Sequence, residues 1–286
     1  MTTAPTNQLF SFTRWRLLLA KHWIENRRRY ILSLLAIGGL LTIWCGFLII
    51  MDAYAPLDVN MQFAAYFVGL FLTGALYSSM LFADLGTKKE ALPWLSLPAS
   101  HLEKLLCALL FGTFLFFIAY TLVFYLVDIP MVEWANSILR NHPRNWPNTN
   151  IRIPPVSIYN IFTGDGAPIP EKEDHLFLSF YFAVQAAFLL GSIYFPRYAF
   201  IKTVVAVVLF TLGFIVFQRG VIYPLLPTGW YNNFFRWSTD LYESGPPKSE
   251  VRLPLPIENL LTLLGQIGLP PFFWFVTYIR LKEKEV

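Results

Sequence analysis

Charged residues are scarce in this sequence. Asp, Glu, Lys and Arg together make up 14% of its 286 residues, whereas a soluble domain contains about 25%. Hydrophobic residues account for 56%, and the mean hydropathy is +0.50. This composition excludes a soluble enzyme and, despite an isoelectric point of 9.0, a nucleic-acid-binding module.

Charge is missing altogether from six long apolar runs. A bilayer core about 30 Å thick needs about 20 apolar helical residues to cross it, and five runs are long enough. The fifth in chain order, 203–217, is shorter and reaches this length if it begins at Tyr198 and Lys202 extends its amine to the interface. The sequence therefore predicts an all-α polytopic membrane protein with six transmembrane helices, at about residues 30–51, 61–82, 105–127, 176–195, 198–217 and 259–279. The runs are too long and too continuous for an outer-membrane barrel, whose strands alternate over about ten residues.

Reactive and metal-binding residues are few. The two cysteines, Cys45 and Cys107, lie in separate apolar runs, which favours small buried side chains over a disulfide or a metal site. The four histidines lie outside the runs or at their edges, and the sequence has no H-E-x-x-H, G-x-S-x-G or G-x-x-x-x-G-K-[ST] motif. We therefore expect no enzyme activity, catalytic residue, metal or cofactor in this chain, and no ATP hydrolysis by it.

The predicted spans also lack the ionisable side chains that a proton or sodium relay requires. Their polar groups are amides and hydroxyls such as Gln62, Thr73 and Gln185. An ion-coupled carrier places titratable groups within the membrane. A permease driven from outside fits this absence, and so does a passive scaffold.

The distribution of basic residues predicts the orientation. With a cytoplasmic N-terminus, fourteen Lys and Arg fall on the inner side and eight on the outer side, where they are spread over two loops of about forty residues. The short loop 52–60 carries two Asp and no base. The positive-inside rule then gives a cytoplasmic N-terminus and C-terminus. Residues 1–29 form the cytoplasmic N-terminal segment, and 30–286 form one transmembrane domain with outer loops 128–175 and 218–256.

An amphipathic segment precedes the first span. Phe12, Trp15, Leu19 and Trp23 recur at helical spacing over Leu9–Arg29, with basic residues on the other side. This pattern predicts an interfacial helix that lies in the membrane plane and turns into the first span at Arg27–Arg29. Trp15, Arg16 and Trp23 are its expected interfacial anchors. The alternative is an ordinary cationic flank that sets the topology.

The inner loop between the second and third spans reads DLGTKKEALPWLSLPASHLEK over Asp84–Lys104. Gly86 can end the second span, Thr87–Leu92 suit one short helix, and Pro93 and Pro98 limit its continuation. Ser100 and Glu103 form a predicted capping box at the start of the third span. The loop is either a docking element for a cytoplasmic partner or a compact connector whose charges set the topology.

The second span carries small residues at four-residue spacing. Ala65, Gly69 and Thr73 lie on one helix face, where small side chains let helices approach closely in lipid. We expect this face to pack within the subunit against the first span, and the alternative is a pathway or dimer surface. In the outer loops, Met131–Leu139 suits a short helix, and the aromatic residues of 218–256 suit a membrane interface.

The N-terminal FSFTRWRLLLAKHWIENRRRY and the inner SSMLFADLGTKKEALPWLSLPASHLEK resemble ABC transporter permeases of the ABC-2 exporter type. In layout the resemblance covers the whole chain: an in-plane elbow helix at Leu9–Arg29, six spans, and a coupling helix at about Gly86–Leu97. By this resemblance the stretch 221–237 would dip into the outer leaflet as short re-entrant helices, the alternative being a loop lying on the surface.

The resemblance implies a transmembrane permease subunit of an ATP-driven exporter in the cell inner (cytoplasmic) membrane. It would pair with a second permease subunit, as a homodimer or heterodimer, and would dock on cytoplasmic ABC ATPase subunits that bind ATP and magnesium. Its expected coupling residues are Lys88, Lys89, Glu90, Leu92 and Trp94. The substrate would be lipophilic or amphipathic and would move by alternating access. The alternative is a non-transporting membrane anchor or regulatory scaffold.

Overall fold

The structure is a computed structural model, and it describes residues 10–51, 56–82, 99–143, 145, 152–161, 174–195, 197–217, 219–220, 231–233, 236–238 and 267–284. Its helices are α1 (Phe12–Met51), α2 (Val59–Met80), α4 (His101–Leu109), the π-helical segment η2 (Leu110–Leu115), α5 (Phe116–Asn141), α6 (Asp174–Tyr194), α7 (Ala199–Phe217) and α10 (Leu269–Lys284). Strands β1 (Tyr231–Asn233) and β2 (Arg236–Ser238) form a small antiparallel hairpin.

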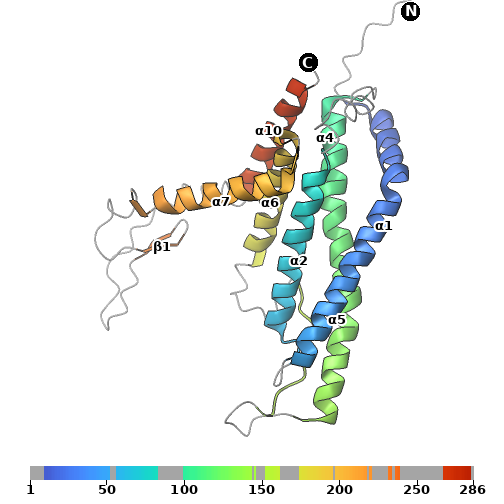
Figure 1. The fold of residues 1–286 in the computed structure, drawn as a ribbon, viewed down its shortest axis with the longest axis vertical. Coiled ribbons are helices and arrows are strands. Elements are labelled where there is room, and N and C mark those ends of the chain that lie inside the picture. The colour runs from blue at the N-terminus through green and yellow to red at the C-terminus, as the bar shows by residue number, and fades with distance from the viewer. Residues whose placement is uncertain are drawn as a thin grey trace, which may run out of the picture.

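Long apolar helices dominate the fold, as the sequence predicts (Figure 1). Within the described residues, five helices are long and apolar enough to cross a membrane: α1, α2, the continuous helix His101–Asn141, Phe177–Tyr194 and α7. The chain is therefore a helical multi-pass membrane protein. The sixth predicted span corresponds in part to α10, whose 16 residues extend about 24 Å at 1.5 Å per residue.

The predicted capping box at the start of the third span is confirmed. The Ser100 side chain accepts a hydrogen bond from the Glu103 backbone N–H, and the Glu103 side chain accepts one from the Ser100 backbone N–H. These contacts satisfy two N–H groups that lack helical partners at this end. Helix α4 therefore begins at His101, four residues before the predicted span.

The third span continues further than the sequence predicts. Helices α4, η2 and α5 form one unbroken helix to Asn141, with Pro130 in its interior. The expected short helix at Met131–Leu139 is thus the end of α5, so the first 14 residues of the predicted outer loop 128–175 continue the helix of the third span. Proline removes one helical hydrogen bond, yet the helix continues past it. Six residues further along, the Asn136 side chain donates to the Val156 carbonyl at 3.0 Å and accepts from the Val156 N–H at 2.8 Å.

Helix α1 has no break at Arg27–Arg29. It runs without interruption from Phe12 to Met51, 40 residues or about 60 Å. The expected in-plane elbow helix is therefore not confirmed, because its residues extend the first span as one helix.

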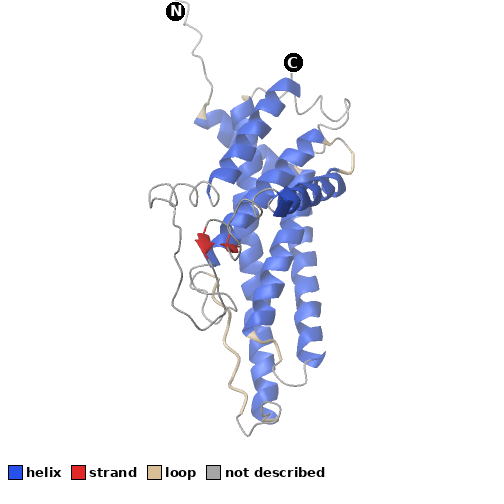
Figure 2. Cartoon of the chain, turned by 90° about the vertical axis from the view of Figure 1, so that its left-hand side faces the viewer, coloured by secondary structure: helices blue, strands red, loops and turns tan. Residues whose placement is uncertain are grey.

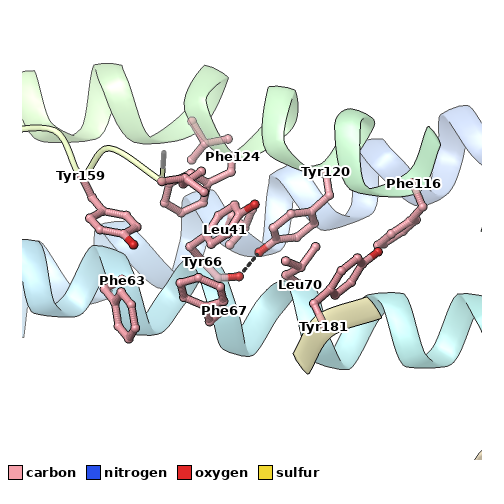
Figure 3. Packing of buried hydrophobic residues seen from close by; sticks show 12 residues of the cluster. Leu41, Phe63, Tyr66, Phe67, Leu70, Phe116, Tyr120, Phe124, Tyr159 and Tyr181 are labelled. Carbon is pink, nitrogen blue, oxygen red and sulfur yellow. Dashed lines mark hydrogen bonds between the residues drawn. The ribbon is translucent and has the colours of Figure 1, made fainter. Parts of the chain in front are cut away.

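Aromatic side chains fill the centre of the bundle (Figure 3). Tyr66 of α2, Tyr120 and Phe124 of α5, and Tyr181 of α6 are almost completely buried. The Tyr120 hydroxyl donates to the Tyr66 carbonyl over 2.9 Å, and the Tyr66 and Thr121 hydroxyls lie 2.9 Å apart. Aromatic packing with internally bonded hydroxyls suits a membrane interior, where an unsatisfied polar group is costly.

Helix α7 leaves the bundle sideways. Figures 1 and 2 show its axis crossing the direction of the other long helices. The chain turns into it through Tyr198, whose φ is 57°. Of its 19 residues, only Thr203 is buried, and it packs against Gly191 of α6. Apart from Lys202 and Thr211, the rest of α7 consists of apolar residues and glycine around its whole circumference.

Several helices meet at one end of the bundle (Figure 1). The starts of α1 and α4 lie there together, and so do the ends of α6 and α10. Lys284 at the end of α10 donates to the Ile193 carbonyl near the end of α6 over 2.5 Å. Helices α6 and α10 therefore run parallel toward this end. We call it the inner end, because the distribution of basic residues predicts that it faces the cytoplasm.

Candidate functional site

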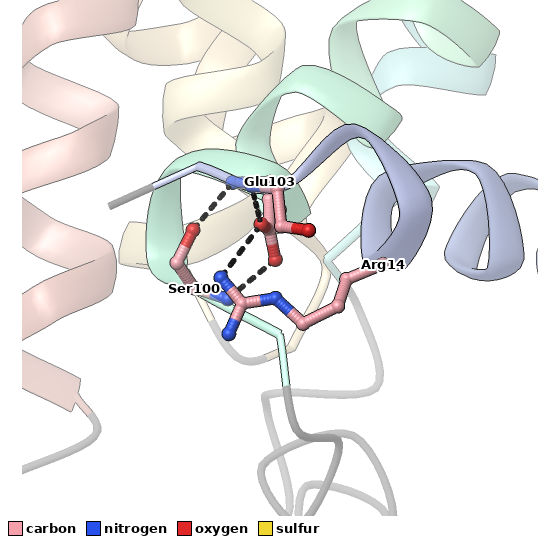
Figure 4. A network of polar contacts seen from close by, with 4 residues as sticks. Arg14, Ser100 and Glu103 are labelled. Atoms are coloured by element: carbon pink, nitrogen blue, oxygen red, sulfur yellow. Dashed lines mark hydrogen bonds and ion pairs between the residues drawn. The ribbon is translucent and has the colours of Figure 1, made fainter. Parts of the chain in front are cut away.

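Glu103 connects the beginnings of two helices at the inner end of the bundle (Figure 4). One carboxylate oxygen accepts from the Ser11 backbone N–H at 2.6 Å and from the Arg14 guanidinium at 3.0 Å. The other oxygen accepts from the Ser100 backbone N–H at 2.9 Å. The side chain has no exposed surface. We call Ser11, Arg14, Ser100 and Glu103 the inner junction.

The position of Glu103 suits its charge. Ser11 directly precedes α1, and Ser100 is the N-cap of α4, so the carboxylate lies at the N-terminal ends of both helices. These ends carry unpaired N–H groups and partial positive charge, which stabilise an anion. Together with Arg14, they compensate for the removal of Glu103 from water.

A small cavity adjoins the inner junction, with a volume of about 60 Å³. Its walls combine basic, acidic and apolar side chains, contributed by Lys21, His22 and Glu25 of α1 and by Lys104 and Cys107 of α4, with Phe82 at the end of α2. Binding pockets for small molecules are typically about 300–1,000 Å³. This cavity is therefore too small to hold a lipophilic cargo, and it assigns no transport site.

An aromatic cluster continues from the cavity toward the bundle core. The Tyr30 hydroxyl lies 2.5 Å from His22 Nε2, and the His22 ring lies 4.7 Å from the ring of Phe111. Tyr30 also contacts Tyr77 of α2 edge to face, at 5.6 Å. Next to the cavity, α1, α2 and η2 are thus joined through rings rather than through charges.

The coupling residues expected from the sequence fall outside the described part of the chain. These are Lys88, Lys89, Glu90, Leu92 and Trp94. The two helices that flank them are described: Phe82 is buried against Leu105 and Leu189, and α4 begins at the inner junction.

The three expected interfacial anchors lie on α1. Trp15 is half-buried and contacts the rings of Phe10 and Phe12. Arg16 is exposed, and Trp23 is exposed with its ring 6.2 Å from that of Tyr30. They lie along one continuous helix, and Arg14 beside them is the residue that reaches Glu103.

The small residues of α2 face α5 rather than only α1. Ala65 is buried, and a Cβ added at Gly69 would overlap the Tyr120 hydroxyl. The Thr73 hydroxyl donates to the Gly69 carbonyl of its own helix at 2.6 Å. One turn further along, Gly74 makes room for Gln185 of α6, which also bonds the hydroxyl of Ser78.

Asp128 is a buried ionisable residue that directly follows the predicted third span. Because α5 continues past residue 127, Asp128 lies within the helix, 1% exposed. Both carboxyl oxygens are buried and have no hydrogen-bond partner among the residues that the structure describes. The predicted span 105–127 itself contains no acidic residue, and Asp128 follows it directly in the same helix. No group of three or more His, Cys, Asp and Glu that could bind a metal occurs in the described ranges.

Length, apolarity and packing of the helices define a multi-pass membrane protein. No family model, no curated protein and no solved structure matches the chain significantly. Its function is therefore proposed from the sequence resemblance and from the geometry of the inner end.

Proposed function

We propose that this chain is the transmembrane permease subunit of an ATP-driven ABC exporter. The observation that carries the proposal is the inner junction. The loop predicted to meet the ATPase lies between Phe82 and Ala99, and Glu103, just after it, is bonded to the start of α1. A partner that displaces this loop must therefore move α1 and α4 together.

Both flanks of the loop are fixed in the bundle. Phe82, at the end of α2, is 2% exposed and packs with Leu105 of α4 and Leu189 of α6. Close-packed helices transmit small displacements rather than absorbing them. This arrangement favours a role in mechanical coupling over a role as a passive connector.

The proposal includes six spans with both termini in the cytoplasm. Helices α6 and α10 run parallel, with Ile193 and Lys284 in contact at their ends. A chain can enter two neighbouring parallel spans only if it crosses back between them. Among the described residues from 195 to 268, α7 is the helix with suitable length and apolarity, and 19 residues can cover about 28 Å. In the structure its axis crosses the direction of the other long helices (Figure 1), so the proposal requires α7 to turn along them in the membrane.

The remaining parts of the proposal follow the family resemblance. Two permease subunits, identical or related, would pair in the inner membrane, and a lipophilic or amphipathic substrate would move between them by alternating access. ATP and magnesium would bind to separate ATPase subunits, which would contact Lys88, Lys89, Glu90, Leu92 and Trp94. The N-terminal part of α1, with Trp15, Arg16 and Trp23, would lie at the inner interface.

Charge reversal in the inner loop tests the proposal. The variant carrying Lys88→Glu and Lys89→Glu should lose co-purification of the ATPase subunit and ATP-dependent transport by at least tenfold, because both bases belong to the segment that the resemblance assigns to ATPase contact. Arg27→Glu with Arg28→Glu is the matched control: it changes the charge of the same membrane face equally, at exposed positions of α1. The control should retain ATPase binding at equal membrane expression.

Two results would contradict the proposal. Unchanged ATPase binding and transport in the Lys88 and Lys89 variant would remove the loop from the coupling path. Capture of a non-ATPase partner through this loop, with no transport by the complex, would identify a membrane anchor instead.

A further inference from the structure

Asp128 lies in an apolar contact between α1 and α5. It belongs to a buried stripe of α5 that includes Phe124, Val132 and Ala135 at three- and four-residue spacing. Beyond it, Val132 and Ala135 pack with Cys45 and Ile49 of α1. The carboxyl group thus lies among apolar side chains, at a position that suits a hydrophobic residue.

Within the described part of the chain, no cation neutralises this carboxyl group. Neither of its oxygens has a hydrogen-bond partner there, and α1 has no charged residue between Arg29 and Met51. An unpaired carboxylate in an apolar interior is costly, and such a group takes up a proton instead.

Among the described residues near this end, several other ionisable groups have interactions of their own. The Cys45 thiol of α1 is close enough to interact electrostatically with Asp128. Asp58 caps α2 by accepting from Val59 N–H at 2.7 Å, Glu133 and Arg140 of α5 pair with each other, and Tyr125 donates to the Tyr159 carbonyl.

We propose that Asp128 is a proton-binding site that closes the contact between α1 and α5. In the conformation described here it carries a proton as a neutral acid. When α1 and α5 separate, water reaches the carboxyl group, its O–H bond breaks, and the proton leaves to the outer aqueous phase. The carboxylate then opposes closure until it is protonated again. This inference does not depend on the ATPase partner.

Infrared spectroscopy of the purified chain tests the protonation directly. The wild-type protein at pH 7 should show the carbonyl band of a protonated carboxylic acid, and aspartate labelled with ¹³C at its carboxyl carbon should shift it. Asp128→Asn should remove this band, and Asp58→Asn, which keeps a good helix cap, should leave it. Absence of the band from the wild-type protein would overturn the proposal without requiring any variant to fold.

The accessibility of Cys45 tests the link to helix separation. Cys107→Ala leaves Cys45 as the single thiol, and Cys45 is 1% exposed between the two helices. A neutral, membrane-permeant thiol reagent should modify it faster as pH rises, in part because more thiolate forms. Adding Asp128→Asn to this variant measures the contribution of thiolate formation alone, because the asparagine amide does not titrate.

The modification rate with Asp128 intact, divided by the rate with Asp128→Asn, should therefore rise with pH. Release of one proton on opening limits the slope of this ratio to about tenfold per pH unit. A ratio independent of pH would show that the carboxyl group does not control the contact, and would overturn the proposal even if the infrared band is present. Either failure leaves the ATPase-docking test unaffected.

Discussion

Arg14 is the residue on which the connection between α1 and α4 most depends. Its guanidinium lies 3.0 Å from Glu103, whose side chain is fully buried, while Arg14 itself is 35% exposed. Removing one partner of a buried ion pair costs about 3–5 kcal/mol. Partial exposure of Arg14 weakens the pair, because water screens it.

We therefore expect Arg14→Ala to lower the free energy of unfolding by about 1–3 kcal/mol. Thermal unfolding in lipid nanodiscs measures the change. Arg16→Ala is the control, because it removes the same charge two residues away from an exposed position and should change stability by less than about 0.5 kcal/mol. Equal effects of the two substitutions would show that the ion pair contributes nothing beyond net charge.

The sequence revealed only half of the inner junction. The capping box of Ser100 and Glu103 could be predicted, because both partners belong to one local motif. Arg14 and Ser11 could not, since their contacts with Glu103 join residues about 90 positions apart and leave no periodic signal. The burial of Asp128 within a helix was not predicted either, because the predicted span ends at Val127, where the charge-free run ends, whereas α5 continues to Asn141.

The contact between α2 and α5 depends on the fact that Gly69 has no side chain. A methyl group there would overlap the Tyr120 hydroxyl, which donates to the Tyr66 carbonyl. Gly69→Ala should therefore destabilise the protein by about 1–3 kcal/mol, as overpacking does. Gly39→Ala on α1 is the control: nothing lies within 4 Å of its added Cβ, and alanine favours the helix by about 1 kcal/mol.

A second substitution separates overlap from other causes. Tyr120→Phe removes the hydroxyl that the new methyl group would meet, so the double variant should be more stable than the sum of the single effects by about 1 kcal/mol. Denaturation of all four proteins in the same detergent measures this coupling. Strict additivity would show that Gly69 and Tyr120 do not constrain each other.

The course of α7 determines the membrane topology of the whole molecule. If α7 crosses the membrane, residue 219 lies on the outer side, and if α7 lies in the membrane plane, that residue lies on the inner side. In a chain lacking Cys45 and Cys107, Arg219→Cys should react with a membrane-impermeant maleimide in right-side-out vesicles. Lys282→Cys, at the exposed inner end of α10, should react only in inside-out vesicles. Reaction of Arg219→Cys only from the inside would reject the six-span topology.

The membrane character of the molecule was predictable because it depends on composition and run length, which are summed over many residues. The C-terminal end of α1 and both ends of α2 and α6 lie within two residues of their predicted positions, because these helices end close to where the apolar runs end. The sideways course of α7 was not predictable. Its residues are apolar on every side, so the sequence holds no stripe that indicates which neighbour the helix should face.

The π-helical turn at Leu110–Leu115 has a geometrical consequence for the two ends of its long helix. It contains one residue more than an α-helical turn would need, and each α-helical residue corresponds to a rotation of about 100° and a rise of 1.5 Å. If the turn rewound as α-helix, His101–Leu109 would rotate by roughly that angle relative to α5, and Glu103 would point away from Arg14. The direction in which the start of this helix faces α1 is thus set by a single extra amino acid at Leu110–Leu115.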